Sequence, residues 1–226
     1  MLTQPPMMRL FFLEPYEDKI QEFSRLGRNN FSSSLEKEEG TFFMACAHEK
    51  DNPAKKIVFE LYEDEAAYQT HAASQHFKTF ASFAKDNLKE RRVVELAPQI
   101  LVEKHGEKAF LSEVAVDMRL ARLKVDLAHA KAFEAIVARE MKTAVAVEDG
   151  VLSLMAARDV SDLSTWYFFE VYSSQEAYDL HRETAHFKDY ITESLEFVSQ
   201  KSLFPLSAEL LVSKGGISFE GGLHEA

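Results

Sequence analysis

A segment that occurs twice constrains this chain more than any other feature, because residues 60–78 return as residues 170–188. The recurring residues keep a constant shift of 110 positions without insertion or deletion, and in the first copy they are Glu60, Tyr62, Ala67, Tyr68, His71, His76, Phe77 and Lys78. The same shift relates residues 8–10 to residues 118–120. An internal repeat fixes the number of domains before any other argument. The sequence therefore predicts two related units, residues 1–107 and 108–226.

Each copy shows the order strand, helix, strand, strand, helix, strand. In the first copy the hydrophobic patterns and turn residues predict strands over Met8–Leu13, Thr41–His48, Ile57–Tyr62 and Arg92–Lys104. A first helix is expected from Tyr16 to a stop at Gly27, then a connection over 31–40, and a second helix from Glu63 to Leu88 with a break near Ser74–His76. The second copy predicts Val114–Lys124, Leu127–Glu140, Val151–Arg158, Trp166–Tyr172, Ser174–Val198 and Leu203–Lys214, after a linker over 105–113.

This order is the split βαβ arrangement of ferredoxin-like units, an α+β fold. The segment Ile57–Tyr62 is apolar on both faces apart from Glu60, so both faces of its sheet must be covered. Helices can cover one face of the sheet. The sheet of the other repeat can cover the second face. We therefore expect two antiparallel sheets packed as an intramolecular dimeric α/β barrel, with the last strands pairing across the interface. Such a pseudo-dimer needs no second chain, although a further homodimer stays open.

Charge and composition limit the partners. The 226 residues carry a formal net charge of -11 without a basic patch, which disfavours binding to nucleic acid or to an anionic membrane surface. No apolar run approaches the length of a membrane span, and the N-terminus lacks the basic region of a secretory signal. We expect a cytoplasmic protein whose partner is a small molecule.

The motif that carries the repeat resembles the antibiotic biosynthesis monooxygenase family of dimeric α/β-barrel proteins. The resemblance rests on an apolar strand, Glu-x-Tyr, an acidic turn, Ala-x-Tyr-x-x-His, Ser or Thr, and x-His-Phe, and it covers both repeats almost entirely. It implies a small pocket in each unit, between the helices and the outer face of the sheet. It also implies three chemistries: oxygenation of quinols or polyketides without metal or flavin, isomerisation of small phosphorylated signals, and haem degradation. Trp166, the sole tryptophan, is matched by Lys56, so tryptophan-dependent chemistry is not expected in the first unit.

Paired histidines are the candidates for chemistry. His71 and His181 are the predicted catalytic residues, because an imidazole titrates near neutral pH and can accept a proton from a phenol. Their alternative role is a polar helix tip bonded to the neighbouring connection. His76 and His186 have two alternative roles: contact with the substrate, or a structural role at a helix break or cap.

The remaining candidates are predicted to contact substrate. Glu60 and Glu170 are carboxylates among apolar neighbours, where burial raises the pKa of the carboxyl group, so that it can serve as a base. The alternative role is an ion pair or hydrogen bond with a neighbour such as Arg9 or Arg119. Tyr68 and Tyr178 are pocket walls or plain helix packing. Trp166 completes the predicted substrate-binding set.

No cofactor and no metal are expected. Histidines five residues apart point about 140° away from one another around a regular helix, and the spacing of a helical zinc pair is absent. The preferred function is a cofactor-independent monooxygenase that acts on a small aromatic or quinol-type substrate, with one pocket per repeat. The alternatives are a non-catalytic small-ligand or haem-binding module, and an isomerase of a small phosphorylated metabolite, so catalysis itself stays open.

Overall fold

The two repeats fold alike in the computed structural model, which describes residues 2–104, 106, 109–112 and 116–221. The first repeat consists of β1 (Met7–Pro15), α1 (Ile20–Lys37), β2 (Thr41–Glu49), β3 (Asn52–Tyr62), α2 (Glu65–Ala73), α3 (Gln75–Asn87) and β4 (Leu88–Glu103). The second consists of β6 (Asp117–Val125), α4 (Ala130–Val147), β7 (Val151–Asp159), β8 (Asp162–Tyr172), α5 (Gln175–His181), α6 (Ala185–Ser194) and β9 (Val198–Ser213). Short strands β5 (Ala109–Ser112) and β10 (Ser218–Glu220) pair with β9 and β4.

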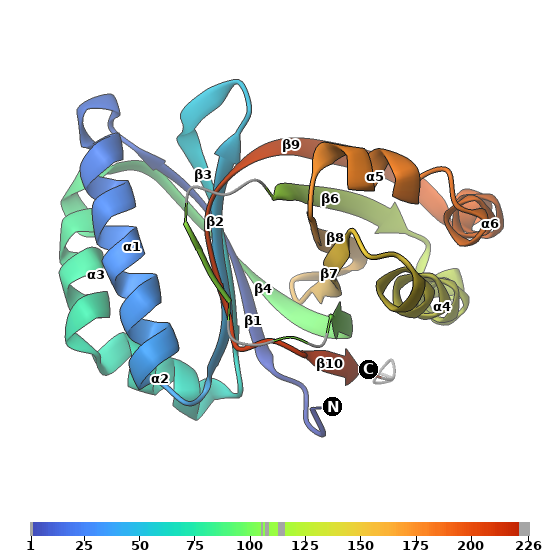
Figure 1. The fold of residues 1–226 in the computed structure, drawn as a ribbon, viewed down its shortest axis with the longest axis horizontal. Coiled ribbons are helices and arrows are strands. Elements are labelled where there is room, and N and C mark those ends of the chain that lie inside the picture. The colour runs from blue at the N-terminus through green and yellow to red at the C-terminus, as the bar shows by residue number, and fades with distance from the viewer. Residues whose placement is uncertain (1, 105, 107–108, 113–115, 222–226) are drawn as a thin grey trace.

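The strands close into one barrel. Their order is β1-β3-β2-β9-β6-β8-β7-β4, and β4 pairs again with β1, which closes a ring of eight antiparallel strands. The helices of the two repeats lie on opposite outer sides of this ring (Figure 1). The predicted α+β architecture with an intramolecular barrel is confirmed.

The last strand of each repeat joins the two halves. The first half of β4 pairs with β1 of its own repeat, and the second half pairs with β7 of the other. Strand β9 does the same with β6 and β2. Pairing of the last strands across the interface was expected and is confirmed. One consequence is that β9 delivers side chains to the helix-covered face of the first repeat.

The barrel interior is filled by apolar side chains from both repeats. Phe59 and its counterpart Phe169 stack with ring centroids 4.7 Å apart, and Phe43 meets both rings edge-on. Alternate residues of β3 point the other way, so Val58 and Tyr62 belong to the core beneath the first-repeat helices. Strand β3 is apolar on both faces because one face lines the barrel and the other lies beneath helices.

Helix α1 runs further than the sequence predicts. Gly27 lies in its interior, so the expected stop at this glycine is wrong, and of the connection expected over 31–40 only residues 38–40 lie outside the helix. A glycine inside a helix costs about 1 kcal/mol relative to alanine. The following turns bury Phe31 and Ser34, and that burial outweighs the cost.

Other boundaries also differ. The single helix expected over 174–198 is two helices, α5 and α6, followed by a short turn of 3-10 helix and the start of β9. The helix expected over 127–140 is α4, over residues 130–147. Strand β5 lies inside the predicted linker 105–113, of which residues 105, 107–108 and 113 fall outside the described part, as do residues 114–115 of the strand predicted next. The division into units at residue 107 stays a prediction. No helix among the described residues is long and apolar enough to cross a membrane.

Candidate functional site

A single residue between α2 and α3 determines where the histidines point. Ser74 ends α2, and its side chain caps α3 by accepting a hydrogen bond from the backbone N–H of Phe77 at 3.2 Å. Thr184 does the same for Phe187 at 3.3 Å in the second repeat. The break predicted near Ser74–His76 is confirmed, and the second repeat has the same break, where a single helix over 174–198 was expected.

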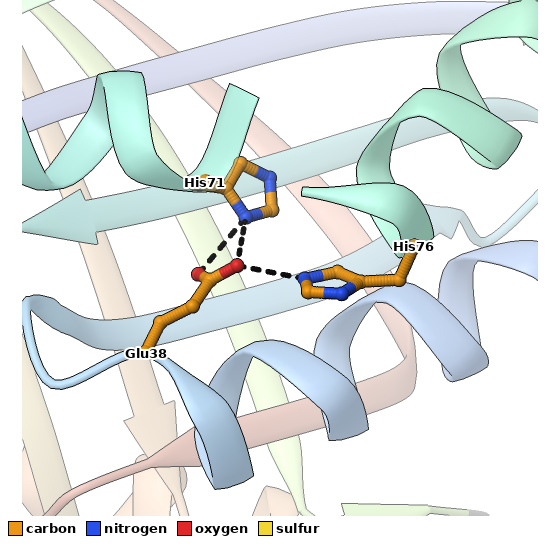
Figure 2. Close-up of side chains that lie close together, drawn as sticks. All are labelled: Glu38, His71 and His76. Atoms are coloured by element: carbon orange, nitrogen blue, oxygen red, sulfur yellow. Dashed lines mark hydrogen bonds and ion pairs between the residues drawn. The ribbon is translucent and has the colours of Figure 1, made fainter. Parts of the chain in front are cut away.

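Because the chain turns at this cap, His71 and His76 converge on one carboxylate (Figure 2). Glu38, directly after α1, lies 3.1 Å from Nδ1 of His71 and 2.7 Å from Nε2 of His76. The hydroxyl of Ser34 is 3.2 Å from both nitrogens. The expectation that the two histidines point apart is wrong, since it assumed an unbroken helix. Burial alone would raise the pKa of Glu38, but hydrogen bonds from His71 and Thr41 hold it at about 2.

The second repeat builds the same cluster with one addition. Glu148 lies 2.8 Å from Nδ1 of His181 and 2.7 Å from Nε2 of His186. A second carboxyl group, Glu140, lies 3.5 Å from Nε2 of His181. Burial, with the nearby charges of Glu170 and Glu148, raises the pKa of Glu140 to about 8. Its counterpart in the first repeat is Asn30.

Both clusters offer donor atoms to a metal ion. The donor atoms of Glu38, His71 and His76 lie within 4.8 Å of one another, and the same holds for the set Glu140, His181 and His186. Carboxylate and imidazole ligands suit zinc and other first-row metals. The spacing argument against a metal therefore fails, while the expectation of no metal stays a prediction.

A cavity of about 590 Å³ lies beneath the helices of the first repeat. Its walls come from α1, α3 and the outer face of the barrel, with one more strand, β9, contributed by the second repeat. The apolar lining is rich in aromatic side chains and includes Phe11, Phe23, Phe31, Phe77 and Phe80. Its volume and lining are typical of small-molecule sites.

Two of the sequence-predicted residues of the first repeat, Glu60 and Tyr68, line this cavity, and His71 and His76 do not. Glu60 accepts a hydrogen bond from the hydroxyl of Tyr62 at 2.9 Å, and burial raises the pKa of its carboxyl group. The guanidinium of Arg9 lies 4.5 Å over the ring of Tyr68, and no ion pair joins it to Glu60 within the described ranges. The arrangement presents a carboxyl group of raised pKa to a ligand in an apolar cavity, which is what a general base requires.

The equivalent space in the second repeat measures about 30 Å³, much less than in the first, and the expectation of one pocket per repeat stays a prediction. Larger side chains fill it: Val137 replaces Gly27, Phe168 replaces Val58, and Trp166 replaces Lys56. Trp166 is fully buried and packs edge-on against Phe133 at 5.0 Å. Of the predicted residues, Glu170 and His181 line the remnant, whereas Tyr178, His186 and Trp166 do not. Burial raises the pKa of Glu170 to about 7.

A charged cluster at the first cavity was not found from the sequence. Glu209 is the extra residue of a bulge in β9, between the partners of Cys46 and Ala47, and bulges commonly redirect a side chain at a functional site. Its carboxylate pairs with the buried ammonium group of Lys56 and lies 2.7 Å from Nδ1 of His48. The sequence signal for this cluster is a difference between the two repeats: Glu209, Lys56 and His48 correspond to Gln99, Trp166 and Arg158. A search for matching positions passes over such residues.

Comparisons with known proteins agree with this geometry. The model of the antibiotic biosynthesis monooxygenase family matches residues 6–82 and again residues 118–193. No curated protein sequence matches the chain. A candidate monooxygenase from Lactobacillus acidophilus NCFM is 27% identical, with a TM-score of 0.90 over 96% of this chain and 100% of its own.

Two further solved structures share the fold. A candidate monooxygenase from Fusobacterium nucleatum is 22% identical, with a TM-score of 0.87 over 97% of this chain and 99% of its own. An anthrone oxidase-like protein is 10% identical, with a TM-score of 0.57 over 99% of this chain and 98% of its own. The two family matches together span more than half of the sequence, one in each half of the barrel. The chain therefore belongs to the antibiotic biosynthesis monooxygenase family, as a member that carries the family's domain twice.

Proposed function

We propose that the chain is a monooxygenase that acts on a small aromatic or quinol-type substrate without a cofactor, in the cavity of the first repeat. The observation that carries the proposal is a buried carboxyl group, Glu60, in the wall of a cavity of about 590 Å³ that is lined with aromatic rings. Membership of the family and the anthrone oxidase-like neighbour in fold support the reaction class.

In this proposal the reaction needs no external reductant. Glu60 takes the proton of a phenolic hydroxyl, and the resulting phenolate passes electrons from its ring to O₂. A new C–O bond forms at a ring carbon, the O–O bond breaks, and the second oxygen atom leaves as water while the ring carbon loses its hydrogen. A ring C–H becomes C=O, so the substrate supplies all four electrons that O₂ requires. The enzyme's part is to orient the ring and to move the proton.

His71 has a supporting place in this proposal. Its ring lies 5.4 Å from that of Tyr62, the residue whose hydroxyl bonds Glu60. Its Nδ1 faces Glu38, while the buried Nε2 has no hydrogen-bond partner among the described residues. His71 therefore acts behind Glu60 as a positioning group. The same relation links His181, Tyr172 and Glu170, in a repeat whose cavity is filled.

Oxygen uptake tests the proposal. Purified protein, treated with a chelator, is given a panel of hydroquinones, hydroxynaphthalenes and anthrones in an oxygen-electrode cell. We expect uptake of one O₂ per substrate converted, with a quinone-type product that carries one atom from ¹⁸O₂. Absence of turnover across the panel, or turnover that the chelator abolishes, contradicts the proposal.

A further inference from the structure

Four cationic side chains line the first-repeat cavity, although the chain as a whole carries a net charge of -11. They come from three elements: Arg28 on α1, Lys85 on α3, and Lys89 and Arg91 on β4. The lining contains two acidic residues. One of them, Glu209, already pairs with Lys56 and His48.

Three of these cations gather at the end of the cavity remote from Glu60. In the sheet Arg91 lies opposite Leu13, which in turn lies opposite Lys56, whereas Glu60 lies opposite Arg9. Leu13 and Arg9 are four residues apart on β1, which corresponds to about 13 Å along a strand. Lys85 and Lys89 stand on either side of Leu88, opposite Pro15, at the same end. We call Lys85, Lys89 and Arg91 the cationic end; Arg28 lines the same cavity from α1, about one turn beyond Ser24, whose hydroxyl donates to Glu209.

Most of this charge is not neutralised by the protein. Lys89 lies 3.5 Å from the carboxylate of Glu14, in a solvent-exposed ion pair of the kind that contributes little. Arg28, Lys85 and Arg91 form no ion pair with any residue in the described part of the chain. A cluster of unpaired cations beside an apolar cavity repels itself, and it is stabilised when a ligand brings an anion.

The second repeat shows that this charge accompanies the cavity and not the fold. The counterparts of the four cations are Ala138, Leu195, Ser199 and Lys201, so one of four keeps its charge where the cavity is filled. The cluster of Glu38 with His71 and His76, in contrast, has its counterpart in Glu148 with His181 and His186. Cationic lining and open volume therefore occur together.

We infer that the ligand of the first-repeat cavity is an aromatic compound with an anionic substituent, a carboxylate or a phosphate. Its anion lies at the cationic end, its ring lies among the phenylalanines, and its hydroxyl points to Glu60. This inference names the substrate class of the proposed oxygenase. Only the position of the hydroxyl group, next to Glu60, rests on the proposed function. Arginine binds carboxylate and phosphate through paired N–H donors, which suits Arg28 and Arg91 to this role.

Binding of a matched ligand pair tests the inference without turnover. Intrinsic ligand fluorescence and calorimetry compare 6-hydroxy-2-naphthoate with its neutral isostere 6-hydroxy-2-naphthamide, at low and high salt. We expect the carboxylate to bind about tenfold tighter or better at low salt, and the advantage to shrink at high salt. The double variant Arg28→Gln with Arg91→Gln should remove the advantage, while the control Lys201→Gln in the second repeat leaves it intact. Equal affinity of the two ligands, or an advantage that survives the double variant, overturns the inference.

Two further probes separate the sources of the anion. Binding of 2-naphthyl phosphate at least as tight as that of the carboxylate supports a phosphorylated aromatic ligand. Ribose 5-phosphate that binds as tightly as either contradicts the aromatic part of the inference. The two proposals fail separately: charge-dependent binding without oxygen uptake removes the oxygenase and leaves the ligand class. Oxygen uptake with neutral quinols, without preference for an anionic substrate, removes the ligand class and leaves the oxygenase.

Discussion

The two repeats keep the same polar cluster beneath their helices and differ in the space beside it. Glu38 with its two histidines has a counterpart in Glu148 with His181 and His186, at closely similar distances. The cavity of about 590 Å³ shrinks to about 30 Å³ in the second copy. This polar cluster persists where there is no room for a ligand, so the fold alone is enough to explain it. A feature present only beside the open cavity is explained by function.

This comparison reassigns the two kinds of candidate residue. The Glu–His–His clusters fasten the end of α1 to the α2–α3 junction, and of α4 to the α5–α6 junction, through buried hydrogen bonds. The open volume, three of the four cations and Glu209 have no equivalent in the second repeat. We assign the clusters to stability, with His71 also packing behind Glu60 through Tyr62. We assign the open cavity, its cations and Glu209 to ligand binding.

The largest expected difference between the repeats is in catalysis. Replacing Glu60 by Gln keeps the shape of the side chain and removes the base, so oxygen uptake should fall on the order of 10³-fold. The matched change Glu170→Gln should alter it by about twofold or less, because the cavity beside it is filled. Steady-state oxygen uptake checks both, with circular dichroism to confirm folding. Equal losses in the two variants would show that both repeats turn over substrate.

The shared clusters should contribute equally in the two repeats. Glu38→Gln leaves the buried His71 and the half-buried His76 without their carboxylate, and Glu148→Gln leaves His181 and His186 with Glu140 alone. Each change should cost about 3 kcal/mol of unfolding free energy at pH 7. The cost in the first repeat should shrink below pH 4.5, because the Glu38 carboxyl, with its pKa of about 2, stabilises the fold when ionised and loses that contribution as the pH falls towards 2. Urea unfolding at several pH values measures this. The exposed neighbour Glu39, changed to Gln, is the control, and a strong asymmetry between the repeats would contradict the structural assignment.

Glu140 should respond to pH in the opposite direction. Its folded-state pKa of about 8 lies above the ordinary value of 4.5, so its contribution to stability is fully present below about pH 4.5 and is lost as the pH rises through 8. Glu140→Gln should therefore stabilise the protein by about 2 kcal/mol at pH 9 and by little at pH 4.5. Thermal and urea unfolding at both pH values test this. A variant that is equally or less stable at pH 9 counts against a neutral, buried carboxyl group.

The smallest change closes the first cavity with the side chain found in the second. A Cβ on Gly27 meets its nearest atom, in the ring of Phe80, at 4.0 Å, so valine has room to enter the cavity. Gly27→Val should weaken the binding of 6-hydroxy-2-naphthoate about tenfold or more without lowering stability, since glycine is a poor helix residue. Calorimetry and thermal unfolding give both values. The reverse change Val137→Gly should lower stability and leave binding as it was, and unchanged affinity in Gly27→Val would place the ligand elsewhere.

The architecture could be predicted because it depends on matches between the copies. Two apolar faces on Ile57–Tyr62 and a constant shift of 110 residues already require a barrel formed within one chain. Helix ends were less predictable, since Gly27 indicates a stop only when the buried turns beyond it are not considered. The convergence of His71 and His76 required the cap at Ser74 to turn the chain, an effect that residue spacing alone does not contain.

The functional differences could not be predicted by the same route. Glu209 enters the first cavity from the last strand of the other repeat, through a bulge, so no local motif contains both it and Lys56. The loss of the second cavity depends on the summed volume of Val137, Phe168 and Trp166, each of which is an ordinary core residue on its own. These functional differences are contained in the positions where the two copies have different residues. Such positions can be interpreted only when the fold shows which of them lie close together.

The central claim is that the chain has one ligand site, in the first repeat. Calorimetric titration of the intact chain with 6-hydroxy-2-naphthoate measures the number of sites directly. We predict one site per chain, weakened in Gly27→Val and unaffected in Glu170→Gln. Two equivalent sites per chain, or one site that Glu170→Gln removes and Gly27→Val leaves intact, would contradict the account.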